Sequence, residues 1–146
     1  MGAIFYFGGK FFAYSVWCYF GLRAFRPQNS PTLGRAIIYG AIRLSLGLFF
    51  GILIYLLSSA LITSLAPGLP ENVIAYLAVY VPVRWIEWSI MAILILPGPI
   101  SPSHWIVGNG RTDRLWRLGG IAISCLADIP LIVSLGGVIP VGRFLC

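Results

Sequence analysis

The stretch VPVRWIEWSI (residues 81–90) places an arginine and a glutamate inside a long apolar segment. Arg84 and Glu87 are flanked by Trp85 and Trp88, and the residues around them are ones that a lipid bilayer accepts. A charge at the centre of a membrane-spanning helix costs about 2.5–3.5 kcal/mol on insertion scales. Such residues therefore need either a partner inside the membrane or a function.

The composition indicates a membrane protein. Of the 146 residues, 59% are hydrophobic and 10% are charged, whereas a soluble domain carries roughly 25% charged residues. This leaves too little polar surface to cover a water-soluble globule, so we expect a lipid bilayer to be the solvent. The net charge is +6, but the basic residues lie mostly between apolar segments. This placement fits anionic lipid headgroups and topology control, so we do not expect nucleic acid as a partner.

Four apolar segments are long enough to cross the hydrocarbon core, which takes about 20 helical residues. Proline- and glycine-rich turns separate them. We predict an all-α integral membrane protein with short loops and a single membrane domain over residues 1–146. Its four transmembrane helices would form one bundle. The predicted spans cover about residues 3–22, 36–65, 73–96 and 119–141.

The loops between these spans differ in charge. Loops 23–35 and 97–118 each hold three arginines, whereas the loop between the second and third spans holds only Glu71. The positive-inside rule therefore predicts that loops 23–35 and 97–118 are cytoplasmic and that both termini lie on the non-cytoplasmic side. A three-span protein would place the two basic loops on opposite sides of the membrane.

All four predicted spans carry a charge in one middle band, roughly 10–18 Å from the cytoplasmic edge at a rise of about 1.5 Å per residue. Arg84 and Glu87 can pair within one helix, because they are three residues apart. Asp128 has no such partner and needs Lys10, Arg43 or Arg84 from another span, or a proton. Two interpretations are open. The band is either a polar lock that fixes helix packing, or a functional site for a proton, an ion, or a lipid or quinone headgroup.

Two further sets of residues indicate contact surfaces. Gly47 and Gly51 form a GxxxG pair, which predicts close helix packing. Nine aromatic residues lie between Phe5 and Phe20 and surround the first span, as expected for a partner surface, a bound pigment, quinone or acyl chain, or plain lipid exposure. In the third loop, after the turn signal at residues 108–110, we expect an interfacial set in contact with lipid headgroups. Its members are Arg111, Arg114, Trp116 and Arg117. A phosphate-binding or partner-docking loop is the alternative.

The sequence lacks the residues for several kinds of chemistry. His104 is the one histidine, so bis-histidine haem ligation within a single copy is excluded. No metal-ligand spacing and no metalloprotease, nucleotide-binding or serine-hydrolase motif occurs. We therefore expect neither a metal site nor a catalytic residue, and the cofactor stays open, with bound lipid as one candidate.

These observations favour a non-catalytic integral subunit of a larger membrane complex. Such a subunit would pack on other integral subunits and could hold a lipid or a hydrophobic cofactor. The alternative is a small homo-oligomeric transporter or proton- or ion-conducting protein that uses Glu87 and Asp128. A third hypothesis is a small intramembrane enzyme built from Glu87, Asp128 and His104 in space.

Overall fold

The structure is a computed structural model that describes residues 2–26, 32–65, 73–96 and 101–134. The described residues form helices and no strand, which confirms the prediction of an all-α fold. The helices are α1 (Gly2–Phe25), α2 (Leu33–Leu65), α3 (Val73–Ile95), α4 (Pro102–Val107) and α5 (Gly110–Ser134). The four long helices overlap the four predicted spans but differ from them at their ends, and residues 135–141 of the last predicted span lie outside the described residues.

The loop predicted at residues 97–118 is more structured than expected. Pro102 stands at the start of the short helix α4, where a proline loses no helical hydrogen bond. Gly108 and Gly110 both adopt positive φ angles, of 81° and 87°, which turn the chain from α4 directly into α5. Helix α5 therefore begins at Gly110 rather than near residue 119, with Asp113 in its first turn.

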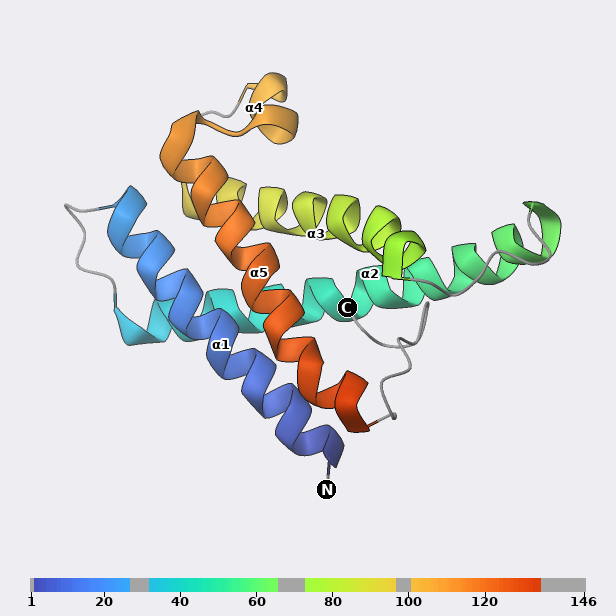
Figure 1. The fold of residues 1–146 in the computed structure, drawn as a ribbon. Coiled ribbons are helices and arrows are strands. Elements are labelled where there is room, and N and C mark those ends of the chain that lie inside the picture. Colours follow the sequence, from blue (N-terminus) through green and yellow to red (C-terminus); the bar gives the residue numbers. More distant parts are fainter. Residues whose placement is uncertain (1, 27–31, 66–72, 97–100, 135–146) are drawn as a thin grey trace.

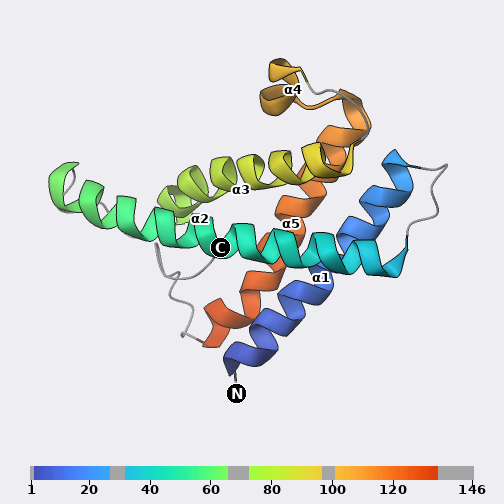
Figure 2. The same cartoon turned by 180° about the vertical axis from the view of Figure 1, so that it is seen from behind.

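The long helices form two antiparallel pairs that cross each other (Figure 1). One pair is α1 with α5 and the other is α2 with α3, and contacts of α1 with α2 and of α3 with α5 join the pairs. Figure 2 shows from behind that α4 lies at one end of this bundle, beside the start of α5 and the end of α3. Each long helix therefore contributes one face to a shared interior.

Glycines let α1 and α5 interlock through two tryptophans. The indole of Trp116 lies on Gly21, where an added Cβ would be 2.6 Å from its Nε1 atom. The indole of Trp17 covers Gly119 in the same way. Trp17 Nε1 donates to the carbonyl of Trp116 at 3.1 Å, and Trp116 Nε1 donates to the carbonyl of Trp17 at 3.3 Å. This reciprocal contact fixes how α1 and α5 lie along each other.

Helices α1 and α2 approach closely at Gly40. A Cβ atom there would lie 2.9 Å from the Cα atom of Ser15, so the two backbones nearly touch. Gly47 and Gly51, which were predicted to support helix packing, are buried further along α2. Their role stays a prediction, whereas the contact at Gly40 is direct.

By length and composition, Leu33–Ile52 of α2 is the one stretch of the described residues that could cross a membrane. A buried core helix can meet the same criterion, so this stretch alone gives weak support for a membrane location. Helix α5 begins with a charged segment, and α1 contains three tyrosines, one tryptophan and Lys10, which lower its mean hydropathy. The four-span topology therefore stays a prediction.

Gly40→Ala is expected to destabilise the fold. The new methyl group would force α1 and α2 apart, and overpacking of this kind costs about 1–3 kcal/mol. Gly34→Ala is the matched control, because a methyl group added at this position of the same helix would meet no neighbouring atom within 4 Å. Thermal unfolding should show a lower midpoint for Gly40→Ala than for Gly34→Ala. Equal midpoints would contradict the close contact.

Candidate functional site

The five charged residues of the predicted band meet in the interior between the four long helices. Lys10 comes from α1, Arg43 from α2, Arg84 and Glu87 from α3, and Asp128 from α5. All five side chains are fully buried. We refer to these five residues as the buried charge cluster.

Asp128 is the most highly coordinated member of the cluster. Its Oδ1 atom lies 2.5 Å from Lys10 Nζ, and its Oδ2 atom lies 3.8 Å from Arg84 Nη2. The hydroxyls of Tyr6 and Tyr80 each donate a hydrogen bond to this carboxylate at 2.7 Å, one to each oxygen. A single carboxylate on α5 therefore binds groups from both α1 and α3.

The carboxylate of Glu87 likewise joins two helices, α2 and α3. Its Oε2 atom accepts from Arg43 Nη2 at 2.5 Å and from Arg84 Nη1 at 2.8 Å. Arg84 contacts both acids, so it connects the Asp128 and Glu87 halves of the cluster. All four long helices are thus joined by one continuous set of ion pairs.

Aromatic rings surround the cations of the cluster. The guanidinium carbon of Arg43 lies 4.8 Å from the ring centre of Tyr14 and 4.9 Å from that of Trp88. Arg43 Nη2 also lies 3.5 Å from Ser124 Oγ, which in turn donates to the carbonyl of Gly120 at 2.9 Å. The ring faces attract positive charge electrostatically. They therefore compensate part of the cost of holding a guanidinium away from water.

The buried charge cluster carries an excess of positive charge. Lys10, Arg43 and Arg84 supply three positive charges, and Glu87 and Asp128 supply two negative charges, which leaves one uncompensated positive charge. Tyr6 and Tyr80 also place their rings 4.6 Å from Lys10 Nζ and 4.7 Å from Arg84 Cζ. The cluster is consequently more sensitive to loss of an acid than to loss of a base.

A second polar cluster holds α4 in place. Arg117 binds both carboxylate oxygens of Asp113, at 2.9 and 2.7 Å, and Ser89 Oγ at 2.6 Å. It also donates to the main-chain carbonyls of His104 and Trp105, each at 3.1 Å. These bonds tie the short helix to α3 and α5, so we interpret Arg117 as a structural clamp.

The four residues predicted to be interfacial divide into two pairs. Arg111 and Arg114 are exposed, and headgroup contact stays a prediction for them. Trp116 and Arg117 are instead buried. Trp116 packs on α1, and Arg117 donates its hydrogen bonds to the groups that hold α4 in place. The prediction placed this segment in a loop, whereas it forms the first turns of α5, where residues three and four apart share an inner face.

Sequence reasoning did not identify several partners of the cluster. These include Tyr6, Tyr80, Ser124 and Trp88. The signal that could have found two of them was helical spacing, because Tyr6 precedes Lys10 by four residues and Tyr80 precedes Arg84 by four residues. A tyrosine one turn before a buried cation shares its helix face and can reach the same carboxylate.

The described residues hold no group of three or more histidine, cysteine or acidic side chains that could bind a metal ion. His104 contributes its main-chain carbonyl to the Arg117 clamp rather than to the cluster around Glu87 and Asp128. The cluster pairs charges of both signs across four helices.

Comparison with known proteins adds no family. No family model matches the chain, and no curated protein or solved structure matches it either. The function is therefore inferred from the geometry of the chain itself.

Asp128→Asn and Lys10→Met should differ in their effect on stability. Asp128→Asn raises the excess positive charge of the cluster, and breaking a buried pair in this way costs about 3–5 kcal/mol. Lys10→Met removes the excess and leaves Asp128 bound to Tyr6, Tyr80 and Arg84, so the loss should be smaller. Chemical or thermal unfolding of both variants measures this order, and the reverse order would refute the charge excess.

Proposed function

We propose that the chain is a four-span integral membrane protein that acts as a non-catalytic subunit of a larger membrane complex. The observation that carries the proposal is the distribution of side chains. Among the described residues, seven charged residues are buried beside an apolar core, whereas large apolar residues are exposed on every long helix. Exposed examples on the four long helices are Phe5, Phe12, Phe20, Ile38, Phe49, Ile52, Ile86, Leu94, Leu118, Leu126, Ile129 and Val133.

This distribution is unfavourable in water for two reasons. Exposed apolar surface is driven out of water, and buried ions lose their hydration. In a bilayer, the same exposed residues meet hydrocarbon, and the charges are best placed inside the bundle with one another. A lipid environment therefore explains both the exposed apolar residues and the buried charges. It also explains why α1, α3 and α5 expose apolar side chains as α2 does.

The positions of the exposed arginines support the proposed orientation. Helix α1 ends, and α2 and α5 begin, toward the left of the molecule in Figure 1. These helix ends carry Arg23, Arg35, Arg111 and Arg114, all of which are exposed. The proposed topology places all of them on the cytoplasmic side, as the positive-inside rule requires.

The pairing of the buried acids favours a lock over a carrier. A proton carrier must exchange its proton with water on each side of the membrane in turn. Glu87 and Asp128 are both fully buried, and each contacts two cations. The alternative of a transporter that uses these two acids is therefore less well supported than a structural role.

An aromatic stripe on α1 offers the surface for a partner subunit. Phe5, Phe12, Val16 and Phe20 are exposed and lie seven, four and four residues apart, which places them on one face of the helix. Tyr14 and Trp17 lie on the inner side, where they contact Arg43 and α5. Aromatic side chains are enriched in protein interfaces, so we propose that a second membrane protein packs on this stripe.

Native mass determination after gentle detergent extraction tests this function. We expect the 16.0 kDa chain to migrate in a much larger assembly that contains other polypeptides. Phe12→Ala should reduce recovery of the assembly, because it truncates the centre of the stripe. Leu126→Ala is the control, since Leu126 is similarly exposed but lies on α5.

The same preparation distinguishes the alternative function. A monomer or small homo-oligomer that conducts protons in liposomes, with the flux abolished by Glu87→Gln, would overturn the subunit proposal. A subunit should show no intrinsic flux, whether Glu87 is present or replaced.

A further inference from the structure

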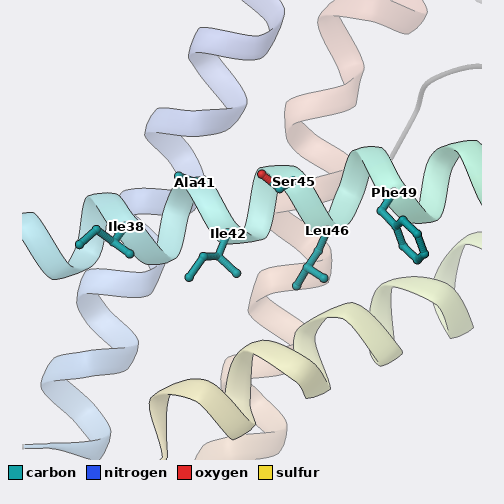
Figure 3. Close-up of a pocket in the computed structure, with 6 residues that line it drawn as sticks. All are labelled: Ile38, Ala41, Ile42, Ser45, Leu46 and Phe49. Carbon is teal, nitrogen blue, oxygen red and sulfur yellow. The ribbon is translucent and has the colours of Figure 1, made fainter.

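A shallow, widely open groove runs along one side of α2, beside α3. Its described lining consists of Ile38, Ala41, Ile42, Ser45, Leu46 and Phe49, and its volume is about 510 Å³. Figure 3 shows that Ile38, Ile42 and Leu46 point to the same side of α2, with α3 on that side in the view. Ser45 is the one polar residue of this lining, so the groove suits a hydrocarbon ligand.

We propose that this groove holds one acyl chain of an anionic phospholipid, whose phosphate is bound by Arg35. The inference rests on the membrane location proposed above and adds a ligand class and its binding residues.

The length of the groove fits one leaflet of a bilayer. Phe49 follows Ile38 by eleven residues, which corresponds to about 16 Å along a helix. The hydrocarbon core of a bilayer is about 30 Å thick, so each leaflet contributes about 15 Å. An acyl chain that enters at the Ile38 end would thus lie against α2 over the depth of its own leaflet.

The groove has a cation at the end where a headgroup would lie. Arg35 precedes Ile38 by three residues and Ile42 by seven, so it shares the helix face of the groove. Its side chain is exposed, and the ion pairs among the described residues do not include it. A guanidinium in this position is suited to a lipid phosphate, which it can bind through two parallel hydrogen bonds.

The side chains of the groove favour an acyl chain over a partner helix. Closely packed membrane helices meet through small residues, which let their backbones approach. This face of α2 instead presents Ile38, Ile42, Leu46 and Phe49, and only Ala41 and Ser45 are small. A flexible chain can follow such a surface, whereas a rigid helix would be held away from it.

Lipid retention measured by native mass spectrometry tests the proposal. The protein is reconstituted in vesicles of phosphatidylcholine and phosphatidylglycerol, washed at alkaline pH, and extracted gently. The wild type should retain phosphatidylglycerol preferentially. Arg35→Gln should lower this preference about fivefold, since one interfacial cation contributes about that factor. Arg23→Gln is the control, because it removes an exposed arginine on the same proposed side of the membrane but on α1, away from the groove. An equal loss of preference in Arg23→Gln would indicate general attraction of headgroups and would overturn the site at Arg35.

A second variant tests the groove itself. Ala41→Phe should fill it and reduce the total retained lipid, whereas Leu126→Phe, at an exposed position on α5, should leave retention unchanged. Unchanged retention and preference in both Arg35→Gln and Ala41→Phe would overturn the lipid site, as would a polypeptide bound in place of lipid.

Loss of the wild-type protein in the alkaline wash would refute the membrane location as well. Firm retention in the vesicles without lipid preference would refute this inference alone.

Discussion

The carboxylate of Asp128 makes the contact on which the rest of the structure depends. It binds Lys10 and Tyr6 of α1 and Tyr80 and Arg84 of α3, so its position on α5 sets where three helices meet. Arg84 then extends the network to Glu87, which brings in α2 through its ion pair with Arg43. Because an isolated buried charge is very costly, each of these groups constrains the position of the others. A polar network of this kind specifies one arrangement of helices out of many apolar packings.

The lipid environment that we propose changes which interactions can hold such a bundle together. The hydrophobic effect does not drive helices together within hydrocarbon, so close packing and polar contacts must do so. The structure shows both, in the indoles that lie on Gly21 and Gly119 and in the buried charge cluster. The outer surface is then left free for lipid and for partner subunits, which is where we place both proposed interactions.

The sequence predicts the four long helices well, because apolar runs separated by proline and glycine are a strong local signal. It also identifies the five charges of the cluster, which stand out against apolar neighbours. It does not reveal which charge binds which, since ion pairs between helices depend on tertiary packing. The roles of Tyr6 and Tyr80, and the burial of Arg117, depend on helix faces. The buried face of Arg117 can be assigned only if α5 is known to begin at Gly110. The glycines and polar residues of this segment predict a loop instead, so the sequence does not show this helix start.

The central claim is that the apolar outer surface faces lipid while the charges face inward. Spin labels at Leu126 and Phe12, introduced after the three native cysteines are replaced by alanine, test it directly in vesicles. We expect both labels to collide frequently with oxygen, which concentrates in hydrocarbon, and rarely with a water-soluble nickel complex. Frequent collision of both labels with the nickel complex would show that this surface faces water and would contradict the proposed membrane bundle.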